Sequence, residues 1–149
     1  MRRENGFTLV ELLTALAIIG ILAALSYPSF HRYIVRGKRT EAQAALLQLM
    51  QQQERFYSQN NSYIAFSSAS TDPSEKLFKW WSGVSAPVSA YEIQALPCTG
   101  ESIKQCVQLN AQPGTDKVDK GFRDSDCGTL SLSSAGSRAA SGMALHCWP

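Results

Sequence analysis

The sequence of 149 residues has no large excess of charge of either sign. Its 14 Lys and Arg residues are nearly balanced by 12 Asp and Glu, which gives a formal charge of +2, and 44% of its residues are hydrophobic. Such values do not mark the whole chain as disordered, nucleic-acid-binding or membrane-embedded. Internal repeats and low-complexity tracts are also absent. Length and composition therefore predict one globular domain with a modest core.

Residues suited to catalysis or metal binding are scarce. The two histidines form no catalytic constellation: His31 follows the expected helix kink, His146 adjoins Cys147, and neither has a paired carboxylate or a glycine-rich phosphate loop near it in the sequence. No histidine lies at zinc-finger spacing from the cysteines, and there is no Cys-x-x-Cys motif. We therefore expect no enzymatic activity, no cofactor and no metal site.

Hydrophobic residues are concentrated near the start of the chain. Residues 7–27 contain a single charged side chain, that of Glu11. About 20 apolar residues in a helix span the roughly 30 Å hydrocarbon core of a bilayer. We therefore expect residues 7–30 to form a transmembrane helix. The two arginines before this segment predict a cytoplasmic N-terminus, by the positive-inside rule.

Four cysteines lie in the last third of the chain: Cys98, Cys106, Cys127 and Cys147. A disulfide framework suits them better than a metal site, and disulfides persist only in oxidising compartments. The part of the chain that contains them is therefore predicted to lie outside the cytoplasm. Four cysteines allow three pairings, of which proximity favours Cys98 with Cys106 and Cys127 with Cys147. Each bond would restrict the unfolded chain and so stabilise the folded protein by roughly 2 to 3 kcal/mol.

Residues 40–57 have apolar side chains at steps of three and four residues, with glutamines and glutamates between them. This spacing is typical of an amphipathic helix. We expect one helix from about residue 8 to residue 57, kinked or loosened at Pro28 and ended by the turn-forming residues 58–62. Its second half is predicted to pack on a sheet.

The C-terminal half of the chain favours strands. Apolar and polar residues alternate in residues 91–95, 107–109 and 129–132, which predicts an antiparallel sheet of three or four strands within about residues 90–147. Residues 64–90 have no clean period and are expected to form a loop. Within it, the apolar cluster of residues 77–81 is expected to be a lid on the sheet edge, with an aromatic binding patch as the alternative. The predicted fold class is α+β.

The start of the apolar segment carries a more specific pattern, in which a glycine precedes Phe7 and a glutamate lies four residues after it. This sequence, Gly-Phe-Thr-Leu-Val-Glu-Leu-Leu, resembles the processing site of the type IV prepilin family, and Pro28 and Tyr33 continue the resemblance. It implies that a prepilin peptidase cuts after Gly6 on the cytoplasmic face and methylates the new amino terminus of Phe7. Residues 1–6 would then be a leader peptide.

The same resemblance implies a role for Glu11 in assembly. An ionised carboxylate within a bilayer costs on the order of 3 kcal/mol or more and needs a partner. In type IV pilins the matching glutamate is thought to neutralise the amino terminus of a neighbouring subunit, here that of Phe7. The implied type IV pilin fold has a long N-terminal helix, with an apolar half in the membrane and a second half on a small antiparallel sheet. Residues 31–149 would form the globular domain, with a disulfide-bounded C-terminal loop.

Residues 127–136 and the pair Cys147-Trp148 resemble PilE-like and ComP-like pilins, and the second group includes a minor pilin that receives DNA during natural transformation. DNA binding requires cations that meet phosphates. The candidates are Lys104, Lys117, Lys120, Arg123 and Arg138. These cations are interleaved with four acids, Asp116, Asp119, Asp124 and Asp126. A solvated loop of mixed charge is therefore the alternative to a DNA site.

Together these features predict a structural subunit of a type IV pilus, more specifically a minor pilin, that supports pilus biogenesis, adhesion, twitching motility or DNA uptake. Its expected partners are other pilin subunits, prepilin peptidase, the inner membrane, the pilus assembly platform and extracellular DNA. We expect a single-pass protein of the bacterial inner membrane before assembly, and an extracellular pilus subunit afterwards.

Two alternative functions share this N-terminal chemistry. The first is a DNA-binding minor pilin that acts as a receptor in natural transformation. The second is a pseudopilin of a type II secretion machine. The four cysteines argue against the second, because the major pseudopilin generally has a calcium-binding C-terminal loop in their place.

Overall fold

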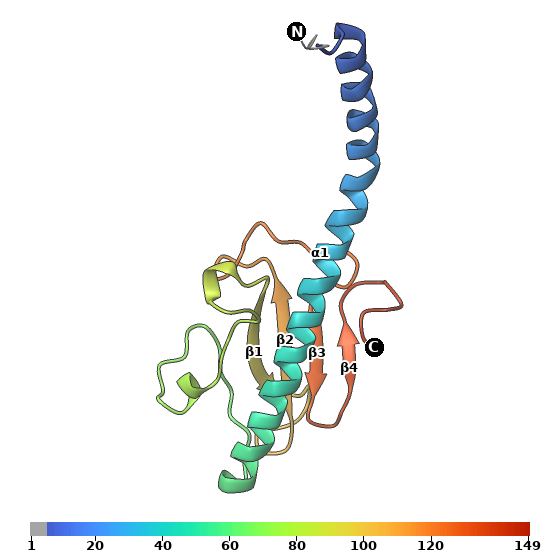
Figure 1. The fold of residues 1–149 in the computed structure, drawn as a ribbon. Coiled ribbons are helices and arrows are strands. Elements are labelled where there is room, and N and C mark those ends of the chain that lie inside the picture. Colours follow the sequence, from blue (N-terminus) through green and yellow to red (C-terminus); the bar gives the residue numbers. More distant parts are fainter. Residues whose placement is uncertain (1–5) are drawn as a thin grey trace. The chain divides into compact units, whose positions relative to one another are not determined.

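The computed structural model describes residues 6–149, apart from the side chains of residues 25–29. Contacts divide the chain into two units, Met1–Arg36 and Gly37–Pro149. The helix α1 (Leu9–Asn60) belongs to both units, and a four-stranded sheet follows it in the second (Figure 1). The α+β class and the single long helix predicted from the sequence are therefore confirmed.

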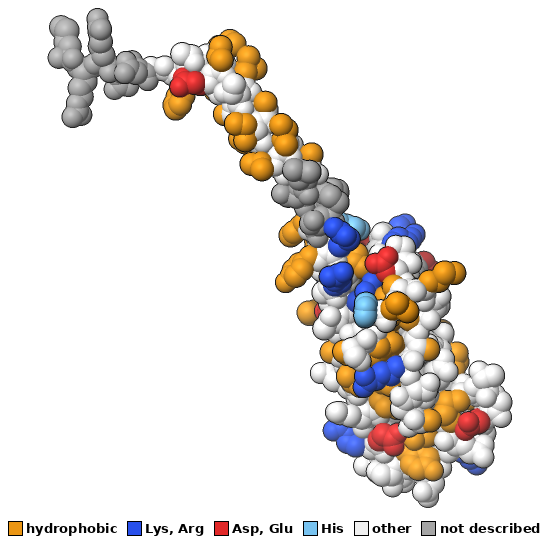
Figure 2. All heavy atoms as spheres, turned by 90° about the vertical axis from the view of Figure 1, so that its right-hand side faces the viewer, with side chains coloured by type: hydrophobic (Ala, Val, Ile, Leu, Met, Phe, Trp, Pro, Cys, Tyr) orange, Lys and Arg blue, Asp and Glu red, His pale blue; other side chains and the backbone are white. Residues whose placement is uncertain are grey.

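In the first unit, the apolar side chains of α1 are not confined to one stripe. Nine Leu, Ile and Val side chains between residues 9 and 22 are each more than half exposed. Figure 2 shows hydrophobic side chains along this segment and one acidic side chain near its start. A helix that is apolar on all sides requires apolar surroundings, whether lipid or other helices.

Over residues 6–149, the structure has no helix whose length and apolar character suffice for a membrane crossing. The helix α1 is continuous through position 28. The kink predicted at Pro28 falls within residues 25–29, whose side chains lie outside the described part of the chain.

The helix runs three residues beyond its predicted end at residue 57. Asn61, which follows its last residue, has a φ of 52°, and its N–H donates to the carbonyl oxygen of Tyr57 at 2.8 Å. A residue in this left-handed conformation commonly ends a helix, and asparagine adopts it more readily than most residues do. The helix therefore ends where two asparagines, Asn60 and Asn61, follow one another.

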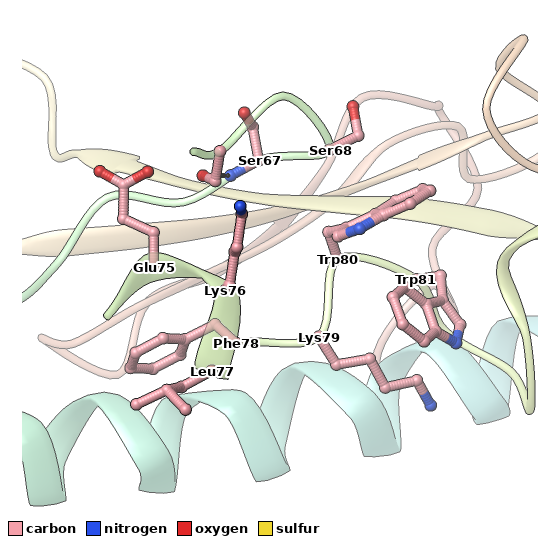
Figure 3. A pocket seen from close by; sticks show the side chains of 10 residues that line it. Ser67, Ser68, Glu75, Lys76, Leu77, Phe78, Lys79, Trp80 and Trp81 are labelled. Atoms are coloured by element: carbon pink, nitrogen blue, oxygen red, sulfur yellow. Dashed lines mark hydrogen bonds between the residues drawn. The ribbon is translucent and has the colours of Figure 1, made fainter. Parts of the chain in front are cut away.

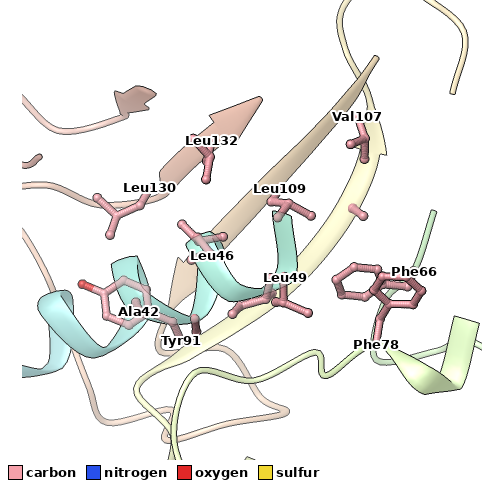
Figure 4. Close-up of a cluster of buried hydrophobic side chains, with 14 of the residues drawn as sticks. Ala42, Leu46, Leu49, Phe66, Phe78, Tyr91, Val107, Leu109, Leu130 and Leu132 are labelled. Carbon is pink, nitrogen blue, oxygen red and sulfur yellow. The ribbon is translucent and has the colours of Figure 1, made fainter. Parts of the chain in front are cut away.

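In the second unit, one face of α1 packs on the sheet (Figure 4). Ala42, Leu46, Leu49 and Gln53 follow one another at three or four residues and are each at most 5% exposed. The amide of Gln53 is paired within the core, because its Nε2 donates to the carbonyl oxygen of Ile64 at 2.7 Å and its Oε1 accepts from the N–H of Ile64 at 3.1 Å. The buried hydrophobic residues of the strands are Tyr91, Ile93, Ala95, Val107, Leu109, Ala111, Leu130 and Leu132. The predicted packing of the second half of α1 is confirmed.

The sheet has the strand order β1-β2-β3-β4, and all neighbouring strands are antiparallel. The strands are β1 (Tyr91–Pro97), β2 (Val107–Pro113), β3 (Leu130–Ser133) and β4 (Arg138–Ala140). The three strands predicted from alternation correspond to β1, β2 and β3. The sequence allowed a fourth strand but did not locate it, because the three residues of β4 are too few to show a period.

Two disulfides close the chain connections of this unit, Cys98–Cys106 and Cys127–Cys147. This is the pairing that proximity in the sequence favours. The first bond closes the β1–β2 connection, and the second ties the β2–β3 connection to the C-terminal residues. The Nε2 of Gln43 on α1 also donates to the carbonyl oxygen of Cys147 at 2.6 Å. The C-terminal segment is thus held by both a covalent bond and the helix.

The loop predicted for residues 64–90 lies along the free edge of β1. Isolated bridges pair Phe66 with Ala95 and Trp81 with Glu92. A strand edge that is covered in this way is protected from pairing with another chain. The loop also contains two short 3-10 helices, η1 (Glu75–Leu77) and η2 (Ala86–Val88).

A buried ion pair joins α1 to the β2–β3 connection. Arg39 donates to the carboxylate of Asp124 from Nε at 2.8 Å and from Nη2 at 2.6 Å, and Asp124 is 3% exposed. The same carboxylate accepts hydrogen bonds from the hydroxyl of Tyr91 at 2.6 Å and from the N–H of Cys127 at 3.1 Å. One side chain thereby links α1, β1 and the disulfide-bounded loop.

These contacts set the ionisation of the cluster. Burial by itself raises the pKa of Asp124, but the hydrogen bonds from Arg39, Tyr91 and Cys127 outweigh it and lower that pKa overall. Burial, and then the hydrogen bond to Asp124, raise the pKa of Tyr91. The cluster is therefore held as an ionised carboxylate, a guanidinium and a neutral phenol.

We predict that Asp124→Asn lowers the free energy of unfolding by about 3 kcal/mol, because it removes the buried counter-charge of the Arg39 guanidinium and leaves only the exposed carboxylate of Asp126 near it. Asp126→Asn is the matched control. Its carboxylate lies 3.8 Å from the same guanidinium but its side chain is 67% exposed, so the expected loss is under about 1 kcal/mol. Chemical denaturation of the full chain in detergent, followed by tryptophan fluorescence, measures both. Equal losses of unfolding free energy in the two variants would contradict a stabilising role for the buried Arg39–Asp124 ion pair.

Comparison of the wild-type chain with Asp124→Asn also gives a test with pH. Because the pKa of Asp124 is lower in the folded protein than in the unfolded chain, its contribution to stability is present above the ordinary aspartate pKa and is lost as the pH falls through the folded value. The stability difference between the wild-type chain and Asp124→Asn should therefore be constant near neutral pH and shrink below about pH 4. A difference that does not change with pH rules out the ion pair as its cause.

Candidate functional site

The predicted cleavage site lies just before α1, in backbone that is neither helix nor strand. The side chain of Phe7 is 87% exposed, and a Cβ at Gly6 would meet no atom within 4 Å. Exposed, irregular backbone of this kind is where proteases cut. The peptide bond between Gly6 and Phe7 is therefore accessible. Residues 1–5 of the predicted leader lie outside the described residues.

Glu11 closes a capping box with Thr8 at the start of α1. Its Oε2 accepts hydrogen bonds from the N–H and from the hydroxyl of Thr8, both at 3.0 Å. The hydroxyl of Thr8 accepts in turn from the N–H of Glu11 at 3.3 Å. Such a reciprocal pair satisfies two of the backbone donors that a helix start leaves without partners. The carboxylate of Glu11 is thus directed toward the N-terminal end of its own helix.

Sequence reasoning assigned Glu11 to assembly and missed Thr8. The signal was present, because a threonine followed three residues later by a glutamate before an apolar run is the pattern of a capping box. Processing after Gly6 would create an amino group at Phe7, one residue before Thr8. The carboxylate is therefore held near the end of the chain at which that positive charge would appear.

The five candidate cations for DNA lie at opposite ends of the sheet. Because β1 and β3 both run antiparallel to β2, the β1–β2 and β3–β4 connections share one end. Lys104 and Arg138 belong to that end. Lys117, Lys120 and Arg123 lie in the β2–β3 connection, at the end toward which β2 points (Figure 1). Since the seven residues of β2 span roughly 20 Å, the structure brings three of the five cations together and not the other two.

Three of these cations are also engaged within the chain. The Nη1 of Arg123 donates to three backbone carbonyls of its own loop at 2.6 to 3.4 Å. The guanidinium of Arg138 lies 5.5 Å from the ring centre of Trp148, and the ammonium of Lys117 lies 3.5 Å from the carboxylate of Asp116. Arg123 thus shapes the loop that carries the exposed lysines.

The acids that alternate with these cations are not equivalent. Asp124 is buried and neutralised by Arg39, which removes it from the surface. The other three, Asp116, Asp119 and Asp126, are exposed. Three exposed acids therefore stand against three cations in the β2–β3 connection, and the local charge nearly cancels.

The structure divides the apolar cluster of residues 77–81. Phe78 is 3% exposed, and its ring stacks on Phe66 at 5.2 Å and meets Phe56 edge-on at 6.0 Å. Phe78 also lines a cavity of about 490 Å³, together with Trp80 and Trp81, which are only partly buried (Figure 3). Phe78 therefore has the place expected of a lid, and the two tryptophans extend the cavity wall beside it.

Two family models match the chain. Residues 28–131, more than half of the chain, match the family described as "Type IV minor pilin ComP, DNA uptake sequence receptor". Residues 1–27 match the "Prokaryotic N-terminal methylation motif". The boundary between the two matches falls within α1.

Curated proteins with similar segments are pilins and fimbrial proteins. The type IV major pilin protein PilA of Myxococcus xanthus is 44% identical over 64 residues, which cover 43% of this chain and 29% of that protein. A fimbrial protein of Moraxella nonliquefaciens is 50% identical over 42 residues, which cover 28% of this chain and 27% of that protein. The matched segments thus span less than a third of these relatives.

Among solved structures, a type IV pilin from Shewanella oneidensis has 28% identity and a TM-score of 0.49, covering 77% of this chain and 98% of that chain. The non-core minor pilin PilV of Neisseria meningitidis has 19% identity and a TM-score of 0.49, covering 77% of this chain and 94% of that chain.

Proposed function

The chain belongs to the family of type IV minor pilins, and from this membership we propose that it is a minor structural subunit of a type IV pilus. Prepilin peptidase removes residues 1–6 and methylates Phe7. Residues 7–30 hold the precursor in the inner membrane, as a single-pass protein with a cytoplasmic N-terminus. Residues 31–149 form the globular domain, which lies outside the cytoplasm before assembly and on the pilus afterwards.

The observation that carries this proposal is the apolar surface of α1 in the first unit, directly after an exposed Gly6–Phe7 bond. Burial of a large aliphatic side chain stabilises by roughly 1.5 to 3 kcal/mol relative to exposure in water. Nine such side chains between residues 9 and 22 therefore give a strong preference for apolar surroundings. Lipid supplies these surroundings before assembly, and the helices of other pilin subunits supply them in the filament.

Glu11 then couples processing to assembly. A carboxylate in an apolar environment costs on the order of 3 kcal/mol unless it is paired. Cleavage after Gly6 creates the amino group of Phe7, which in a neighbouring subunit neutralises this charge and fixes the position of the incoming chain. A pseudopilin is not favoured, because the matched family is that of the minor pilins.

The experiment compares Glu11→Gln with Thr8→Val in the native host. Glutamine serves in a capping box as glutamate does, so Glu11→Gln removes the charge and keeps the helix cap. Thr8→Val removes the hydroxyl of the cap and keeps the charge. We expect Glu11→Gln to lower the amount of subunit in sheared pili, relative to the membrane fraction, by about tenfold or more, since each 1.4 kcal/mol changes an equilibrium tenfold. Thr8→Val should stay near the wild-type ratio.

Equal losses for the two variants would mean that Glu11 acts only as a helix cap. A wild-type ratio for Glu11→Gln would contradict the proposed charge pair. Immunoblots of sheared pili and of membranes from the same cells measure both ratios.

A second function is favoured by the matched family, which is described as a DNA uptake sequence receptor. We propose that the β2–β3 end of the sheet contacts the DNA backbone through Lys117 and Lys120. Both side chains are exposed, and Arg123 braces the loop that presents them. Because exposed acids offset these cations, the contact supplies only a few phosphate interactions.

The salt dependence of DNA binding tests this contact. Titration of duplex DNA with the full chain in detergent gives the slope of log affinity against log salt. The double variant Lys117→Gln/Lys120→Gln should reduce the magnitude of the slope by about 2, because each phosphate contact contributes about 0.9. Lys104→Gln, at the opposite end of the sheet, is the control and should leave the slope unchanged. An unchanged slope in the double variant would exclude these lysines as phosphate ligands.

A further inference from the structure

The loop between α1 and β1 forms two adjoining cavities that neither filament assembly nor the proposed DNA contact uses. The tryptophan cavity, of about 490 Å³, is lined by Ser67, Ser68, Ser70 and residues 75–81. The glutamine cavity, of about 340 Å³, is lined by Lys79, Trp81 and one face of α1, namely Ala45, Gln48, Leu49, Gln51, Gln52 and Arg55. Lys79 and Trp81 belong to both. We propose that the two cavities form one binding site for an acidic saccharide.

The glutamine cavity offers positive charge and hydrogen-bond donors without an opposing acid. Its lining contains Arg55 and Lys79 and no Asp or Glu. Figure 3 shows the side chain of Lys79 and the indole nitrogen of Trp81 both directed toward α1. Charge-assisted hydrogen bonds from such groups to an anion are stronger than hydrogen bonds between neutral groups. This cavity therefore suits a carboxylate.

The indole nitrogen of Trp81 is a second, independent sign of an acceptor. Its Nε1 is buried and donates to no acceptor among the described residues of the protein. A buried donor without a partner costs on the order of 1 to 3 kcal/mol. A carboxylate oxygen that enters the glutamine cavity would remove this cost. Native proteins leave few buried polar atoms unpaired, so an unpaired donor in a cavity wall marks a place for an acceptor, a water or a ligand, that the protein itself does not supply.

The tryptophan cavity suits the sugar ring that carries this carboxylate. Figure 3 shows Trp80 and Lys76 on one side of the cavity and Ser67 and Ser68 on the other. An aromatic face packs on the C–H surface of a pyranose, while hydroxyls and a carboxylate bind the ring hydroxyls. The charges of Glu75 and Lys76 offset one another, and Lys79 is shared with the glutamine cavity, so one carboxylate on the ligand is enough for the two cavities.

The walls of the site are fixed by contacts elsewhere. The N–H of Ile93 in β1 donates to the carbonyl oxygen of Trp80 at 2.7 Å. The Nε2 of Gln52 on α1 donates to the carbonyl oxygen of Leu77 at 3.0 Å. Phe78 is buried between these two attachments. A site that is ordered before binding loses little conformational entropy when a ligand enters.

A nucleic acid fits the two cavities less well than a saccharide. Every nucleotide carries a phosphate, so a bound strand would place repeated phosphates along the site, and only the glutamine cavity has cations in its lining without an acid. A saccharide with one acid group and several hydroxyls needs only one such place. The tryptophan and glutamine cavities together therefore favour an acidic sugar over a polyanion.

The test uses the full chain in detergent micelles on an array of oligosaccharides that contain uronic or sialic acid, each beside its neutral counterpart. At least one acidic member should bind about tenfold or more tightly than its neutral counterpart, with calorimetry giving both affinities. Arg55→Gln should remove this preference. Trp81→Phe keeps an aromatic side chain and loses the N–H, and should weaken the binding of acidic ligands. Trp80→Ala should weaken acidic and neutral members alike.

Arg32→Gln, an exposed arginine of α1 in the first unit, is the control for loss of one positive charge and should bind as the wild-type chain does. The proposal is overturned if no acidic member binds, if neutral members bind equally well, or if Trp81→Phe has no effect on acidic ligands. It is also overturned if single-stranded DNA displaces the bound saccharide and loses affinity in the same variants, because the site is then one for nucleic acid.

Discussion

The ion pair between Arg39 of α1 and Asp124 of the β2–β3 connection is the interaction on which the arrangement of the second unit depends, because it joins three parts of the chain. Asp124 also accepts from Tyr91 in β1 and from the backbone of Cys127. The disulfide between Cys127 and Cys147 then links these contacts to the C-terminal segment. The loop that presents Lys117 and Lys120 begins and ends beside these contacts, so its position on the sheet follows from one buried carboxylate.

The first unit depends on a different constraint, the need of an apolar helix for apolar surroundings. Its side chains suit lipid and helix neighbours alike, which lets one segment serve as a membrane anchor and as a filament core. Glu11 is the single charged residue of positions 7–27, and its hydrogen bonds to Thr8 hold the carboxylate at the helix start. There the backbone donors and the proposed amino group of Phe7 both favour a negative charge.

Local signals predicted much of this structure. The long helix, its amphipathic second half and the strands β1 to β3 each have a clear period, and the capping box of Thr8 and Glu11 was visible although it was missed. Contacts between distant residues had no such signal. Asp124 appeared as one acid among four in a mixed loop, and its partner Arg39 lies 85 residues away. The cavities beside Trp80 and Trp81 were covered only by the alternative of an aromatic patch, because hydropathy does not separate Phe78, which is buried in the core, from its neighbours.

Peptide mass spectrometry of the subunit from sheared pili tests most directly the claim that processing after Gly6 produces the pilin and the charge that Glu11 meets. The account predicts an N-terminal peptide that starts at Phe7 with one methyl group on its amino nitrogen. A peptide that retains residues 1–6, or one that starts beyond the apolar segment, would contradict it.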